Sequence, residues 1–70
     1  MSDETFNMSL RKFLKRVGVT SQQHIETAVR EAKVSGALPG GAVSARMVLT
    51  LEGIDGEHVV IGEIELGDDA

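Results

Sequence analysis

Few side chains in this 70-residue chain have the types and spacing needed for chemistry. Cysteine is absent, and the two imidazoles belong to His24 and His58. The sequence contains no Cys/His pair, no nucleophile elbow and no two-histidine spacing for a metal on a helix face. A weak surface metal site at His58, Glu57 and Glu52 is conceivable, but surface or half-buried polar roles for both histidines are the stronger interpretation. We therefore expect no enzymatic activity, no bound metal and no cofactor.

The length of the chain supports the same expectation. A substrate pocket needs roughly 300 Å3 or more of enclosed space, which a chain this short has difficulty forming. The stretch Pro39-Gly40-Gly41 lacks the Lys-Ser/Thr of a phosphate-binding loop, so we interpret it as a linker. No run of about 18 apolar residues is present, and the N-terminus is acidic rather than basic. We expect a cytoplasmic protein that does not contact a membrane.

Charge is distributed unevenly along the chain. Residues 1–20 carry a net charge of +2, and residues 39–70 carry −6, with one arginine against seven acidic residues. Such a surface can steer a partner or a second copy of the same chain. A solvated surface without any partner is an equally open interpretation. We expect the contact surfaces to be the acidic hairpin and the cations of the basic segment, which are Arg11, Lys12, Lys15 and Arg16.

The N-terminal half is predicted to form two helices. Apolar residues recur at helical spacing over residues 4–17, and Gly18 stands where a C′ glycine ends a helix. A capping-box pattern that begins at Thr20 predicts a second helix over residues 21–35, followed by a second C′ glycine, Gly36. The apolar positions of the two helices are Phe6, Leu10, Phe13, Leu14, Val17, Ile25, Ala28, Val29 and Ala32.

The C-terminal half is predicted to form a β-hairpin. Apolar and polar residues alternate over residues 43–52 and 58–66, and Asp55-Gly56 between them is typical of a tight two-residue turn. A four-residue loop would keep the same faces, and residues 67–70 are expected to fray. The tight turn predicts the pairs Leu51 with Val60, Met47 with Ile64, and Arg46 with Glu65.

Together these elements predict a single α+β domain over residues 1–70, with two helices followed by an antiparallel hairpin. A chain this short has a small core, and no disulfide or metal supplements it. We therefore expect the domain to depend on good helix packing or on self-association.

The N-terminal half also resembles a known family. The run Thr5-Phe6-Asn7-Met8-Ser9, the segment Arg11 to Lys15, and Val17-Gly18-Val19-Thr20-Ser21-Gln22 are similar to a family of short bacterial proteins of unknown function. The stretch from Ile25 to Ala32 matches the same family. The resemblance implies a bacterial origin, and it brings no catalytic residues because the family has no assigned activity.

Two functions remain open. The first is a protein-interaction domain, possibly homodimeric, because the hairpin has two open strand edges and a second face that exposes Val48, Val59 and Ile61. The second is a small nucleic-acid-associated regulator, because two helices and a hairpin have the outline of a winged helix-turn-helix. Acidic residues at the would-be wing tip, Glu52, Asp55 and Glu57, argue against the second function.

Overall fold

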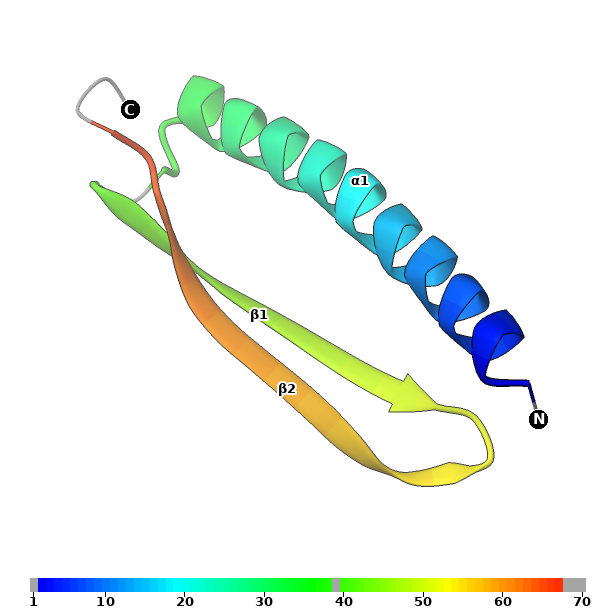
Figure 1. Ribbon diagram of the computed structural model, residues 1–70. Coiled ribbons are helices and arrows are strands. Elements are labelled where there is room, and N and C mark those ends of the chain that lie inside the picture. Colours follow the sequence, from blue (N-terminus) through cyan, green and yellow to red (C-terminus); the bar gives the residue numbers. More distant parts are fainter. Residues whose placement is uncertain (1, 39, 68–70) are drawn as a thin grey trace. The chain divides into compact units, whose positions relative to one another are not determined.

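The computed structural model describes residues 2–38 and 40–67. One helix, α1 (Asp3–Ser35), is followed by two strands, β1 (Ala42–Leu51) and β2 (Ile54–Glu65) (Figure 1). The chain divides into two compact units, residues 1–37 and residues 38–70. The α+β composition is as predicted, but the number of helices is not.

The prediction of two helices, 4–17 and 21–35, is wrong, because α1 is continuous through Gly18. Gly18 is absent from the glycines with positive φ, so its backbone does not have the left-handed conformation of a C′ residue. Thr20 does not begin a helix either. Its hydroxyl donates to the carbonyl oxygen of Arg16 at 2.7 Å, a bond made within a helix. A glycine inside a helix costs about 1 kcal/mol relative to alanine, which a 33-residue helix can tolerate.

Both ends of α1 are capped. Ser2 has extended backbone, and its side chain accepts a hydrogen bond from the Thr5 amide at 3.4 Å. Gly36 has φ 79°, and the amide of Ala37 donates to the carbonyl of Ala32 at 2.9 Å. This pattern is a Schellman-type ending. The predicted end of the helical region at Gly36 is confirmed.

The apolar stripe of α1 runs without interruption across Gly18. Residues eleven apart lie almost above one another, because three helical turns take about 10.8 residues. Phe6, Val17 and Ala28 form one such row. The most shielded residues of α1 also follow the stripe: Val17, Ser21, Ile25, Val29 and Ala32. A continuous helix therefore keeps on one side the apolar positions that were assigned to two helices.

The hairpin is antiparallel as predicted, but its register differs by four residues. Met47 lies opposite Val60, where the tight turn had placed it opposite Ile64. A type I′ turn at Asp55-Gly56 needs positive φ at both residues, and in the described chain only glycines have positive φ. The chain instead reverses between Leu51 and Ile54, with φ 82° at Gly53. Asp55-Gly56 lies within β2, where it causes an irregularity in the pairing.

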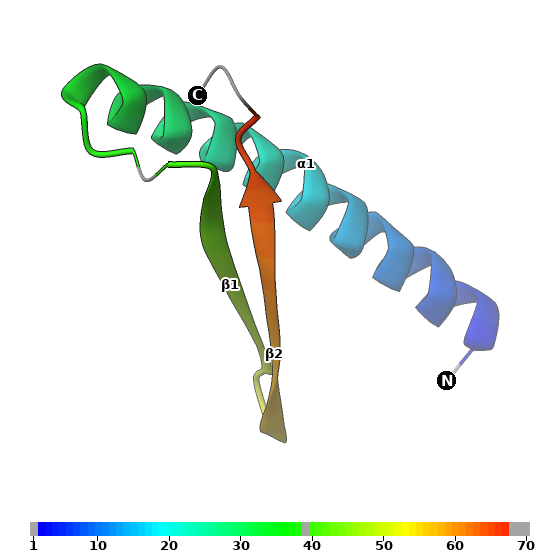
Figure 2. The ribbon, with the colours of Figure 1, turned by 90° about the vertical axis from the view of Figure 1, so that its left-hand side faces the viewer.

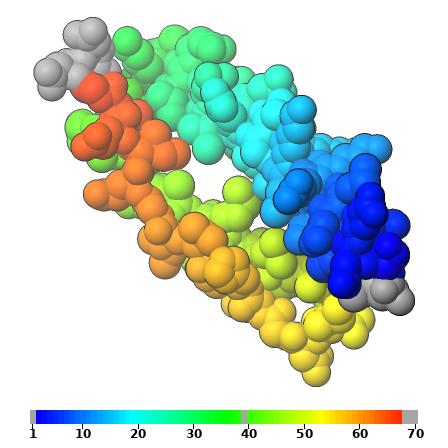
Figure 3. Space-filling view, viewed as in Figure 1, coloured from blue at the N-terminus to red at the C-terminus, as the bar shows by residue number. Residues whose placement is uncertain are grey.

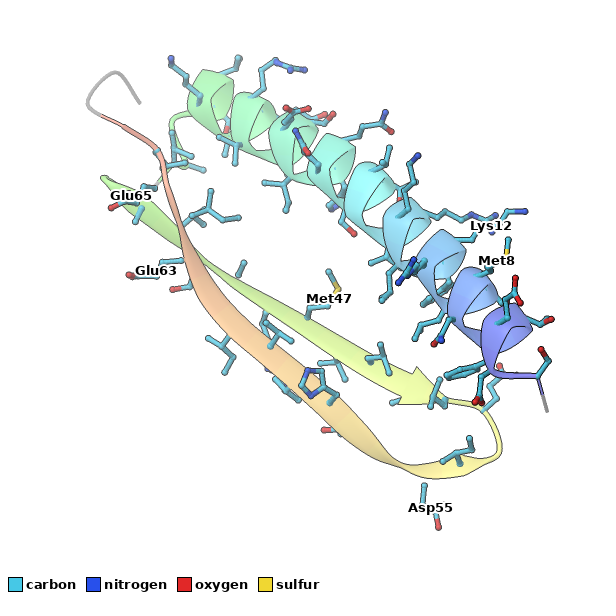
Figure 4. All side chains as sticks on the ribbon, viewed as in Figure 1. Met8, Lys12, Met47, Asp55, Glu63 and Glu65 are labelled. Atoms are coloured by element: carbon cyan, nitrogen blue, oxygen red, sulfur yellow. The ribbon has the colours of Figure 1, made fainter. Side chains whose placement is uncertain are left out.

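A shift by an even number of residues leaves the two faces of the hairpin unchanged. Figure 4 shows Met47 projecting from the side opposite to Glu63 and Glu65, and Figure 2 shows the twist of the paired strands. We call the apolar side the Met47 face: Val43, Ala45, Met47, Leu49, His58, Val60 and Ile64. We call the other side the Val48 face: Ala42, Ser44, Arg46, Val48, Thr50, Glu57, Val59, Ile61, Glu63 and Glu65.

None of the described residues is fully buried. In the space-filling view the hairpin runs from green through yellow to orange (Figure 3). The predicted frayed tail includes residues 68–70, which lie outside the described residues. Gly67 follows the end of β2.

Candidate interaction surfaces

The four cations predicted as an interaction surface lie together on α1. Arg11, Lys12, Lys15 and Arg16 are all exposed, and they project away from the apolar stripe. Figure 4 shows Lys12 and Met8 on the same side of the helix. We call these four residues the basic cluster. Its positive charge is spread over about one and a half helical turns.

A shallow hollow borders the basic cluster. It is lined by Ser9, Lys12, Phe13 and Arg16, which all belong to consecutive turns of α1. A hollow formed by one helix is a surface groove. It can accept a side chain of a partner, but it does not surround a small molecule on several sides as substrate pockets do.

The three apolar residues predicted as a contact patch lie together on the Val48 face. Val48 lies directly opposite Val59, and Ile61 lies opposite Arg46. The side chain of Ile61 is 72% exposed and that of Val48 is 43% exposed. Sequence reasoning missed the position of Arg46 beside Ile61, because the predicted register placed this arginine opposite Glu65. The alternation of residues 43–52 put it on the correct face.

Acidic side chains lie at both ends of this patch. Glu57 is opposite Thr50, and Glu63 is opposite Ser44. The apolar centre of the Val48 face therefore has a carboxylate on each side along β2. The basic cluster belongs to the other unit of the chain.

The histidines are not gathered into a metal site. His58 lies opposite Leu49 on the Met47 face, whereas Glu57 is on the Val48 face and Glu52 is in the turn. His24 is exposed on α1. Within residues 2–38 and 40–67, no three His, Cys, Asp or Glu side chains are grouped closely enough to hold a metal ion.

The phase of the β ladder identifies the backbone groups at the outer edge of β1. The amide of Leu66 donates to the carbonyl of Gly41 at 2.9 Å, so this pair is of the hydrogen-bonded type. Hydrogen-bonded and non-hydrogen-bonded pairs alternate in an antiparallel ladder. The residues of β1 whose amides and carbonyls point away from β2 are therefore Ala42, Ser44, Arg46, Val48 and Thr50.

Comparison with known families agrees with the resemblance of the N-terminal half. The family model of DUF6494, a family of unknown function, matches residues 1–67. The chain belongs to DUF6494. No curated protein and no solved structure matched it. The DUF6494 assignment confirms the predicted membership in an uncharacterised family and assigns no activity to any residue.

Two further findings concern the predicted partners of this DUF6494 chain. In the described residues, α1 is not apolar enough over a sufficient length to cross a membrane. The helix-turn-helix outline required a turn at Gly18-Val19, and both residues are helical. The geometry that suggested a nucleic-acid-associated regulator is therefore missing from the described part of the chain.

Proposed function

We propose that this DUF6494 member is a non-catalytic protein-interaction domain that acts as a homodimer. One observation carries the proposal. No residue is buried in the described part of the chain, while thirteen large apolar side chains are exposed. On the Val48 face, Val48 lies opposite Val59 and next to the row of Ile61. A contiguous apolar patch on the surface of a small protein typically marks a site of protein contact.

The energetics favour a second chain as part of the folded unit. A two-stranded hairpin is only marginally stable by itself in water. Full burial of a valine or isoleucine side chain contributes about 1.5–3 kcal/mol. A small domain has a total stability of about 5 kcal/mol, so covering even two such side chains changes the folding equilibrium substantially.

Sedimentation of the full chain tests this function directly. We expect a dimer of the 7.5 kDa chain and a melting temperature that rises with protein concentration, because association stabilises the folded state. A 7.5 kDa species alone at about 100 μM, with a melting temperature independent of concentration, contradicts the homodimer.

A further inference from the structure

We propose that the homodimer forms when β1 pairs in antiparallel fashion with β1 of a second copy. The product is a four-stranded sheet with the order β2-β1-β1-β2. This inference rests on the proposed function, because it specifies how the two copies join.

The outer edge of β1 lacks the features within a strand that normally prevent strand pairing. Open edges are usually protected by charged residues, proline or a bulge. Arg46 is the one charged residue between Ala42 and Leu51, and this segment contains no proline. Its pairing with β2 is regular from Ala42 to Thr50. The outward-facing amides of Ser44, Arg46, Val48 and Thr50 are therefore evenly spaced along an edge that can accept another strand. The amide of Ala42 donates instead to the carbonyl of Gly40 at 3.0 Å.

The outer edge of β2 is protected. β2 contains four acidic residues, and the irregularity at Asp55-Gly56 interrupts its pairing near the turn. Among the registers that keep each face of the hairpin continuous, two give the greatest overlap of β2 with a second β2. With the two-fold axis at Val60, Glu57 lies opposite Glu63 of the second copy. With the axis at Val59, Asp55 lies opposite Glu63. Like charges directly opposite each other destabilise a strand pair, so β1 is the favoured edge.

The faces of the hairpin determine the register of the β1 pair. The two copies are related by a two-fold axis perpendicular to the sheet. The Met47 face is continuous across both copies only if this axis places a residue of β1 directly opposite the same residue of the second copy. The two such registers with the greatest overlap have the axis at Arg46 or at Met47. An axis at Arg46 places two guanidinium groups opposite each other. The axis at Met47 places Arg46 opposite Val48, so this register is favoured.

The resulting sheet combines the contact patches of the two copies. On the Val48 face, one row of side chains crosses the four strands. It consists of Ile61 and Arg46 of one copy, followed by Val48 and Val59 of the second copy. The two-fold symmetry generates an identical row beside it. Six apolar side chains and two arginines thus form a single patch. Its two ends carry Glu57 and Glu63, where the carboxylates remain in water.

Single-cysteine variants test this arrangement, because the native chain contains no cysteine. In the proposed dimer, Met47 faces its own equivalent in a non-hydrogen-bonded pair, where Cα atoms are about 4.5 Å apart. A disulfide can span this distance. Val60 is the matched control, because it lies opposite Met47 on the same face and the two are similarly exposed, 52% and 45%. The two copies of Val60 would be separated by three strand spacings, about 14 Å, which is too far for a disulfide.

In a glutathione redox buffer, where oxidised glutathione accepts the two electrons, we expect Met47→Cys to form covalent dimers at least about tenfold faster than Val60→Cys. Circular dichroism of each reduced variant checks that it is folded. A sedimenting dimer in which Met47→Cys cross-links no faster than Val60→Cys overturns the edge pairing and leaves the homodimer intact. A monomeric native chain overturns both.

Hydrogen exchange on the native chain provides a test that needs no substitution. The amides of Arg46 and Val48 point outward from β1, and those of Val59 and Ile61 point outward from β2. We expect exchange at Arg46 and Val48 to be at least about tenfold slower than at Val59 and Ile61, and to accelerate on dilution as dimers dissociate. Equal rates at all four amides in a sample that sediments as a dimer contradict pairing through β1.

Discussion

Substitution of Gly18 by alanine distinguishes one continuous helix from two helices, because the change in the free energy of unfolding has opposite signs in the two cases. A Cβ built on Gly18 meets no atom within 4 Å, so the methyl group adds no steric strain. In a helix interior, alanine is more favourable than glycine by about 0.8–1 kcal/mol. We therefore expect Gly18→Ala to raise the free energy of unfolding by about 1 kcal/mol and the melting temperature by about 4–8 °C. If Gly18 ended a helix in the left-handed conformation, the same change would be destabilising.

Gly36 is the matched control for this prediction. A Cβ there also meets no atom within 4 Å, but its φ of 79° is a conformation that costs an L-residue about 1–2 kcal/mol. Gly36→Ala should therefore lower the melting temperature, so the two variants should differ by about 2 kcal/mol. Thermal unfolding is followed by circular dichroism at 222 nm, with all samples at one protein concentration. A loss of stability in Gly18→Ala similar to that in Gly36→Ala would refute the continuous helix.

Three further predictions use the same preparations. Thr20→Ala should lower the free energy of unfolding by no more than a few tenths of a kcal/mol, because the hydroxyl bond to Arg16 is exposed. A loss of about 1 kcal/mol in chemical denaturation would instead indicate that Thr20 is a true N-cap. Ser2→Ala should lower stability by about 0.5–1 kcal/mol, because the cap bond to the Thr5 amide is lost, and an unchanged denaturation midpoint would contradict this role. The dissociation constant of the native chain for duplex DNA in about 0.15 M salt, measured by fluorescence anisotropy, should be higher than about 10 μM. A sub-micromolar, salt-sensitive complex would contradict the proposed function.

The sequence predicts the helical region well but does not reveal its continuity. The apolar period and the glycine at Gly36 correctly give the extent of helix over residues 4–35. The error arose at Gly18 and Thr20, because glycine and threonine are typical of helix ends and are also tolerated inside helices. Local residue preferences cannot separate these two cases. The phase of the apolar positions on the two sides of Gly18 could have done so, since it is unbroken.

The hairpin illustrates the same limit for strands. Alternation correctly assigned residues to the two faces, because side-chain direction depends only on whether the shift in register is even or odd. The turn was misplaced because Asp55-Gly56 and Gly53 both offer a glycine for a reversal, and local preference favoured the wrong one. The shared face of Val48, Val59 and Ile61 was therefore predicted correctly, while the cross-strand neighbour of Arg46 on that face was not.

The unbroken stripe of α1 restricts how the length of this helix can vary within DUF6494. Deleting one residue between Val17 and Ser21 would rotate the C-terminal half of the stripe by about 100° relative to the N-terminal half. Insertions of seven or eleven residues rotate it by only about 20°, because they add nearly whole turns. Natural length differences between family members in this segment should therefore occur in steps of two or three turns, and single-residue insertions near Gly18 should be selected against.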